Sequence, residues 1–167
     1  AIYYLPRMLE GGEDVKFIAR RLLISASEDI GNANPTALVL ATSTFQAVER
    51  IGMPESRILL SQCVVYLASS AKSNASYMAI NAAQSLVQET GDLPVPLHLR
   101  NAPTSLMSKL GYGEGYAYDH DAPQGHSNQE CMPEGLEGRR IYEPGNNSRE
   151  QSMRTHLKSL WKDKYGY

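Results

Sequence analysis

Apolar residues recur every three or four positions through residues 1–90, which is the spacing of α-helices that bury one face. Glycine and proline interrupt this spacing at short intervals. Glycine commonly ends a helix because it tolerates positive φ, and proline suits a first helical turn. The pattern predicts helices over about 1–10, 14–30, 34–51, 54–67 and 73–90.

Two of these helices carry a finer expectation. Asn34 followed by Pro35 predicts an N-cap and a first helical residue for the third helix. The helix over 73–90 is rich in alanine and serine. Small side chains let helices approach closely, so we expect this helix to be central.

The pattern changes after Gly91. Residues 92–96 form a proline-stiffened, extended strap, and a short helix is expected over 103–110. Residues 111–137 are irregular and contain six acidic residues with no lysine or arginine. An amphipathic helix is expected over 149–162.

The fold class predicted from this order is all-α, a helical bundle with a long irregular loop region and a C-terminal helix. We expect residues 1–167 to be a single domain. Its parts are a helical core over 1–91, a strap, short helix and loop over 92–145, and a C-terminal helix and tail over 146–167.

Composition narrows the functional classes. The 167 residues carry a net charge near −2, so any phosphate contact has to come from a local patch. No apolar stretch has the length of a membrane span, so no membrane partner is expected. Cys63 lies in an apolar run, which predicts that it is buried. The only other cysteine is Cys131, so the sequence shows no pattern of paired cysteines typical of disulfide-stabilised proteins. This predicts a reducing, cytoplasmic setting.

Catalytic motifs are weak. The glycine-rich residues 111–115 lack the lysine and the strand-to-helix context of a phosphate-binding loop. Adjacent His120 and Asp121 could bind a divalent metal in a small helical phosphohydrolase, but two ligands fall short of the usual three or four. Cys131 near His126 lacks an orienting third group. We therefore expect no catalytic, cofactor or metal residues, and His120/Asp121 remains the alternative.

Interface or phosphate contacts have better candidates. Glu28 and Asp29 fall in the last turn of the helix over 14–30, where the helix dipole disfavours negative charge. An arginine such as Arg100 or Arg50 could compensate this negative charge, or a partner subunit could contact it. Arg139 and Arg140 precede Tyr142, and such a group can hold phosphates or carboxylates. The candidate contact residues are Glu28, Asp29, Arg100, Arg139, Arg140 and Tyr142.

Several longer motifs resemble one family. They are MLEGGED at 8–14, FIARRL at 17–22, ASEDIG at 26–31, AVERIGMPE at 47–55, KSNA at 72–75, LPVPLHLRNAPT at 93–104, LGYG at 110–113 and LEGRRIYEP at 136–144. Together they resemble the C-terminal domain of the replication-associated recombination protein A family, bacterial relatives of the Werner-helicase-interacting ATPases. Residues 124–131 depart from the family's usual aromatic-rich stretch.

The resemblance implies a AAA+ ATPase related to clamp loaders, whose site for ATP and Mg lies in an N-terminal region outside this sequence. It implies that the helical C-terminal domain assembles into a homotetramer. It also implies partners: DNA, single-stranded or at forks, and replication proteins, in the bacterial cytoplasm at the nucleoid.

The leading hypothesis is therefore a homo-oligomerisation domain of a AAA+ ATPase that maintains replication forks, with no activity of its own. Obligate oligomer faces resemble a core cut in half. Some apolar residues on the third to fifth helices should then be exposed in a single copy. Direct DNA binding through Arg139, Arg140 and the basic tail is a further hypothesis.

Overall fold

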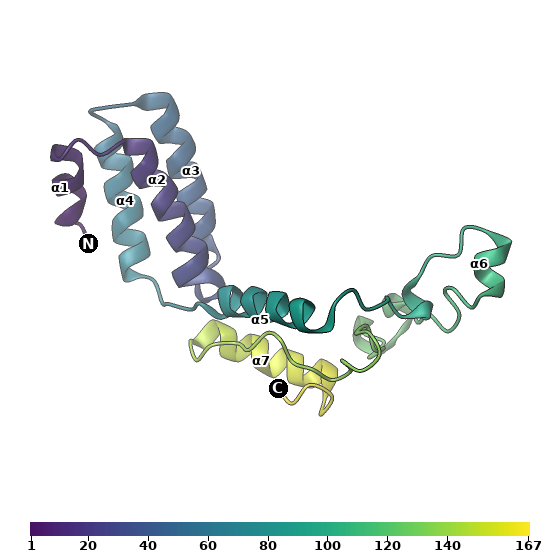
Figure 1. Ribbon diagram of the computed structural model, residues 1–167. Helices are drawn as coiled ribbons and strands as arrows, with labels where there is room; N and C mark the ends of the chain where they lie inside the picture. Colours follow the sequence, from purple (N-terminus) through teal and green to yellow (C-terminus); the bar gives the residue numbers. More distant parts are fainter. The chain divides into compact units, whose positions relative to one another are not determined.

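The computed structural model describes residues 1–167, except for the side chain of Gln124 (Figure 1). Gln124 is the first residue of the segment that departs from the family pattern. The α-helices are α1 (Tyr4–Glu10), α2 (Val15–Ser25), α3 (Thr36–Ile51), α4 (Ser56–Ser69), α5 (Ala75–Thr90), α6 (Ser105–Lys109) and α7 (Ser148–Trp161). A π-helical turn covers Ala26–Ile30, and 3-10 turns cover Gly31–Ala33, Leu97–Leu99, Asp119–Asp121 and Pro123–Gly125.

The described residues contain helices and irregular chain but no strand, which confirms the all-α prediction. The predicted helices appear in the predicted order, most with ends shifted by a few residues. None of them is long and apolar enough to cross a bilayer.

The chain divides into two compact units. The first contains Ala1–Asn81 and Tyr142–Met153, and the second contains Ala82–Ile141 and Arg154–Tyr167. That residues 1–167 form one domain stays a prediction.

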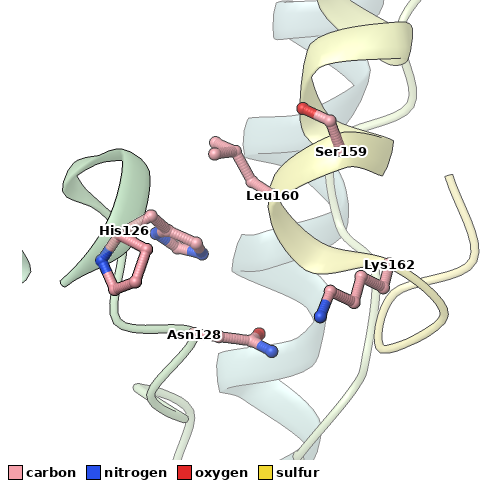
Figure 2. A pocket seen from close by; sticks show the side chains of 6 residues that line it. His126, Asn128, Ser159, Leu160 and Lys162 are labelled. Atoms are coloured by element: carbon pink, nitrogen blue, oxygen red, sulfur yellow. The ribbon is translucent and has the colours of Figure 1, made fainter.

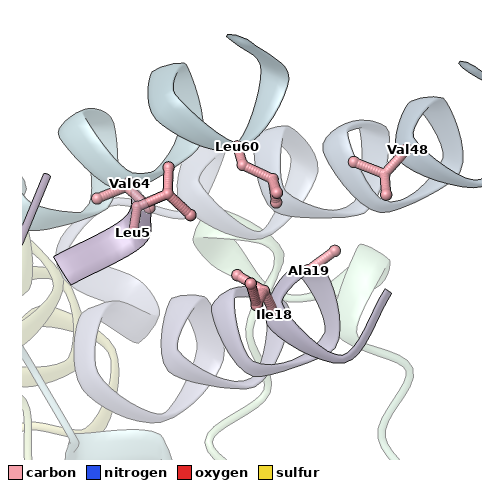
Figure 3. Close-up of a cluster of buried hydrophobic side chains, with 6 residues drawn as sticks. All are labelled: Leu5, Ile18, Ala19, Val48, Leu60 and Val64. Carbon is pink, nitrogen blue, oxygen red and sulfur yellow. The ribbon is translucent and has the colours of Figure 1, made fainter. Parts of the chain in front are cut away.

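Helices α1 to α4 build the main core of the first unit. Six buried side chains pack together there: Leu5, Ile18, Ala19, Val48, Leu60 and Val64 (Figure 3). Leu60 and Ile18 are at most 2% exposed. Each helix contributes one face, as the three-to-four-residue spacing predicts.

A second cluster continues this core toward the end of α2. It contains Ala26, Ile30, Ala37, Ala41, Cys63 and Leu67. Its alanines leave little side-chain volume between the helices, so α3 can lie close to α2 and the π turn. Cys63 is buried, as its apolar surroundings predicted, and burial raises the pKa of its thiol, despite a hydrogen bond with Thr44.

The predicted side-chain cap of α3 is wrong. Asn34 makes no capping bond, and the residue before α3 is Pro35. The Asn34 amide instead donates to the Tyr66 hydroxyl on α4 at 3.0 Å and to Oγ of Ser70, the residue after α4, at 3.1 Å. The Asn34 side chain therefore makes a tertiary contact in place of the local helix cap that the sequence pattern predicts.

The expectation that the fifth helix is central is also wrong for a single chain. Among the α5 residues, only Ala75 and Leu86 are buried. Tyr77, Met78 and Ile80 are 44–55% exposed. The small residues of α5 therefore do not mark close packing within the chain.

The strap of the second unit is held by one arginine. Arg100 Nε donates to the Val95 carbonyl at 2.6 Å, and its Nη1 donates to the Tyr112 hydroxyl at 3.2 Å. The Arg100 guanidinium also lies 5.1 Å from the centre of the Tyr112 ring. These contacts fix the extended residues 94–96 against the turn that follows α6.

We expect Leu60→Ala to lower the free energy of unfolding by about 2–5 kcal/mol, because it leaves a cavity in a fully buried site. Chemical denaturation followed by circular dichroism measures this change. Gln62→Ala, on an exposed position of the same helix, is the control and should change stability little. Equal effects of the two substitutions would contradict this account of the core.

Candidate functional site

The end of α2 is wound as a π-helical turn, a form often found at functional positions. Gly31 leaves this turn with φ +49°, and a Cβ there would lie 3.0 Å from the Ser73 carbonyl oxygen. The Ser73 N–H donates to the Asp29 carbonyl at 2.8 Å. The π turn and the chain before α5 are therefore locked together through the backbone.

A pocket of about 470 Å³ lies at this junction and is lined by Asp29, Lys72, Ser73 and Asn74. Ser73 Oγ accepts from the Ala75 N–H at 3.2 Å at the start of α5. Lys72 Nζ donates to the Leu67 carbonyl at 2.5 Å. The pocket thus brings the ASEDIG and KSNA motifs, distant in sequence, to one place.

The two acidic residues of the π turn find different surroundings from those expected. Asp29 is exposed and accepts a hydrogen bond from Ser25 Oγ at 2.6 Å. Glu28 is half-buried. Within the second unit, Arg100, which we considered as their partner, bonds to Val95 and Tyr112. Within the first unit, a serine hydroxyl hydrogen-bonds to the Asp29 carboxylate.

Tyr142 leads to a buried carboxylate that the sequence analysis missed. Glu150 is 0% exposed, and its Oε1 accepts from the Tyr142 hydroxyl at 3.0 Å. Its Oε2 accepts from Asn147 Nδ2, and its own N–H donates to Asn147 Oδ1 at 3.0 Å. The pattern Asn-x-x-Glu at the start of α7 is a capping-box spacing, so the sequence did contain this signal.

The close packing around Glu150 includes Gly145. A Cβ at Gly145 would lie 2.6 Å from Glu150 Oε2 and 3.2 Å from Ser73 Oγ. The start of α7 therefore sits against the chain that enters α5. Within the first unit, Tyr142 acts as a hydrogen-bond donor to this buried cluster, and its phosphate-binding role is untested.

Arg139 and Arg140 are both exposed, and Arg140 contacts the C-terminal tail. Its Nη1 donates to the Gly166 carbonyl at 2.5 Å, and its guanidinium lies 5.5 Å from the centre of the Tyr167 ring. Arg140 is thus engaged within the second unit. Tyr142 is engaged within the first unit, where its hydroxyl donates to Glu150.

Glu130 is the centre of a second network, which the sequence analysis also missed. Its Oε1 accepts from the Tyr165 hydroxyl at 3.0 Å, and its Oε2 lies 3.4 Å from Lys164 Nζ. Burial acts to raise the pKa of this carboxyl. Hydrogen bonds from the Met132 N–H and Tyr165, with the Lys164 charge, outweigh burial and lower it.

The same contacts act on Tyr165 in the opposite direction. Burial, together with its hydrogen bond to Glu130, raises the pKa of Tyr165 to about 12. The Trp161 ring packs edge-on against Tyr165, with ring centres 4.8 Å apart. The tail after α7 is therefore held against the loop by the Lys164–Glu130 ion pair and the Tyr165–Glu130 hydrogen bond. The ring contact between Trp161 and Tyr165 holds it against the end of α7.

A cavity of about 290 Å³ lies between the loop and the end of α7, lined by Pro123, His126, Asn128, Ser159, Leu160 and Lys162. Figure 2 shows Leu160 pointing toward His126 and Lys162 pointing toward Asn128. The His126 ring packs against Trp161 at 4.3 Å, and its Nε2 is buried with no partner among the described residues. The cavity is large enough for a water molecule to bond this nitrogen.

The residues of the alternative, His120 and Asp121, occupy an exposed 3-10 turn. The His120 ring lies 5.0 Å from the Tyr118 ring. Neighbouring Asp119 accepts from Ser127 Oγ at 2.6 Å and from its N–H, which lower the pKa of Asp119. In the described part of the chain, no three His, Cys, Asp or Glu side chains converge as metal ligands. The geometry does not support the phosphohydrolase.

Large apolar side chains are exposed on α3, α4 and α5, as we expected for a single copy of an oligomerising chain. On α3 and α4 they are Leu38, Val39, Ile51, Ile58 and Val65, and on α5 they are Tyr77, Met78, Ile80 and Val87. Val39 is 64% exposed. Large apolar side chains that gather on an exposed surface commonly mark an interaction site.

We expect Gly31→Ala to destabilise the chain more than Gly12→Ala. Both glycines have positive φ, which costs a residue with a Cβ about 1–2 kcal/mol. Only at Gly31 would the Cβ also press on a backbone oxygen. Free energies of unfolding from urea titration compare the two, and equal losses would contradict the backbone lock at the π turn.

We expect the tail to detach in acid. Folding lowers the pKa of Glu130, so the ionised carboxylate stabilises the docked tail. This stabilisation is complete above the ordinary glutamate pKa of about 4.3 and is lost as the pH falls through the lower pKa of the folded chain. Emission of Trp161, the single tryptophan, reports the change. Glu130→Gln should remove the acid transition, whereas Glu134→Gln should retain it, and a transition unchanged in Glu130→Gln would refute the assignment.

Comparison with known proteins identifies the family to which this chain belongs. The family model described as "MgsA AAA+ ATPase C terminal" matches residues 1–161. Replication-associated recombination protein A of Coxiella burnetii is 49% identical over 94% of this chain and 36% of its own length. The protein of the same name from Escherichia coli K12 is 41% identical, over 90% and 34%.

A more distant organism supplies a further relative. ATPase WRNIP1 of Dictyostelium discoideum is 40% identical over 90% of this chain and 18% of its own length. The chain spans about a third of the length of the bacterial relatives described above. On the family match and these identities, the chain belongs to the family of C-terminal domains of the MgsA-type AAA+ ATPases, with replication-associated recombination protein A among its members.

Proposed function

We propose that this chain is the homo-oligomerisation domain of a AAA+ ATPase that acts in replication-fork maintenance and recombination. The observation that carries the proposal is the exposed apolar surface of α3, α4 and α5. A stable homo-oligomer interface is large and apolar, and it covers such side chains. The resemblance to the family favours a homotetramer.

The role of the domain in this proposal is mechanical. It holds several ATPase modules in a fixed arrangement, so that hydrolysis in one module is coupled to DNA bound by the assembly. ATP and Mg would bind in the part of the protein that lies outside this sequence. DNA and replication proteins would be partners of the whole protein in the bacterial cytoplasm, at the nucleoid.

The names of the related proteins support the general part of this role. They describe AAA+ ATPases and proteins associated with replication and recombination. The finer part, assembly through this domain, depends on the helices. The tightly packed clusters of the first unit bury one face of α3 and α4 and leave side chains such as Val39 and Ile58 exposed. Most of α5 is exposed as well.

We expect the 167-residue chain to assemble, and the double variant Val39→Glu with Ile80→Glu to weaken that assembly strongly. Both side chains are more than half exposed, so the changes spare the core while placing charge in an apolar interface. Multi-angle light scattering across a concentration series measures the mass. Gln46→Glu, an exposed position on α3, is the control.

A strictly monomeric wild-type chain at high concentration would contradict the proposed function. If the double variant assembled like the wild type, oligomerisation would stand but the α3 and α5 surface would be the wrong interface. Circular dichroism of each variant verifies that its helices remain folded.

A further inference from the structure

A groove of about 420 Å³ lies along the proline strap of the second unit. We call it the strap groove, and its lining residues are Pro94, Val95, Pro96, Leu97, His98, Arg100, Glu130, Met132, Glu134 and Glu137. One wall is the extended strap, and the other wall is the acidic segment that contains Met132.

The strap groove combines apolar contact area with negative charge. Val95 is 54% exposed and Leu97 is 47% exposed. The cation in the groove, Arg100, already binds the Val95 carbonyl and the Tyr112 hydroxyl. Glu134 and Glu137 are exposed, and Glu134 has no ion-pair partner in the described part of the chain. The groove therefore favours an occupant with a positive charge beside apolar side chains.

The chain itself carries a surface of that chemistry on α2. Phe17 and Ile24 are each 42% exposed, and Arg20 and Arg21 lie between them at helical spacing. The Arg20 guanidinium lies 5.9 Å from the centre of the Phe17 ring. We call these four residues the α2 face.

The α2 face points away from the core. The neighbouring residues Ile18 and Ala19, on the other side of the same helix, are buried in the core with at most 2% exposure. Neither Arg20 nor Arg21 has an ion-pair partner within the residues that the structure describes. The arginines thus stand among apolar side chains with their charges unmatched.

We propose that the α2 face of one copy of this chain docks in the strap groove of a neighbouring copy. The proposal rests on the proposed function and adds a second contact to the α3, α4 and α5 surface. Arg20 and Arg21 pair with Glu134 and Glu137, while Phe17 and Ile24 cover Val95 and Leu97. Arginine–carboxylate pairs form strong charge-assisted hydrogen bonds, and complementary charges select which surfaces meet.

Such a contact joins two different surfaces, so it is heterologous. A heterologous contact can repeat from copy to copy and close into a ring, in which each chain gives one face and receives another. The contact gives a physical reason why residues 111–137 are acidic and contain no lysine or arginine, since Arg20 and Arg21 of the neighbouring copy would supply the positive charge.

Charge reversal tests the pairing directly. The groove-reversed variant is Glu134→Arg with Glu137→Arg, and the helix-reversed variant is Arg20→Glu with Arg21→Glu. Light scattering and sedimentation equilibrium measure the assembly of the 167-residue chain. Each variant alone should raise the dissociation constant of the assembly by about tenfold or more.

Two combinations should restore assembly. A chain with both reversals should return close to the wild-type dissociation constant, because each pair is rebuilt with opposite sign. An equimolar mixture of the groove-reversed and helix-reversed chains should form mixed assemblies, since the contact lies between copies. The matched control, Glu114→Arg with Asp121→Arg, makes the same charge change on exposed residues outside the groove and should leave assembly unchanged.

Each other result overturns the proposal in a distinct way. Wild-type assembly that both reversed variants retain would refute this contact and leave the proposed function standing. Loss without rescue by the combined reversals, or equal loss in the control, would also refute the contact. Rescue in the combined chain but not in the mixture would place the pairing within one chain. A monomeric wild type would refute both the contact and the proposed function.

Discussion

The close approach of α2 to α3 is the constraint on which the rest of the first unit depends. Ala26, Ala37 and Ala41 are at most 1% exposed, and no larger side chain could fit between these helices without moving them. The π turn at the end of α2 continues this contact and delivers the chain to Gly31. From there the backbone of the π turn meets Ser73, which fixes where α5 begins.

Two carboxylates stabilise the segments that have little apolar core of their own. Glu150 is fully buried and receives hydrogen bonds from Tyr142 and Asn147. Glu130 joins the irregular loop to the C-terminal tail through Lys164 and Tyr165. A buried carboxylate is tolerated only when such donors surround it, so each cluster specifies one arrangement of its segment.

The division between covered and uncovered apolar surface connects the fold with the proposed role. One face of α3 and α4 fills the two core clusters, and the other face carries exposed side chains such as Val39 and Ile58. A helix needs one apolar face to pack within a chain. In the proposed assembly, another copy of the chain covers the second apolar face of these helices.

The sequence by itself determined the order and approximate ends of the helices, because apolar spacing and glycine or proline stops act over a few residues. Its long motifs also identified the family. Only the tertiary structure decided which partner each polar side chain takes, since those partners lie far away in sequence. Asn34 bonds to Tyr66 instead of capping α3, and α5 is exposed where small residues indicated burial. Glu130 could not be singled out among six acidic residues of its segment, because Lys164 and Tyr165 meet it only when the tail folds back.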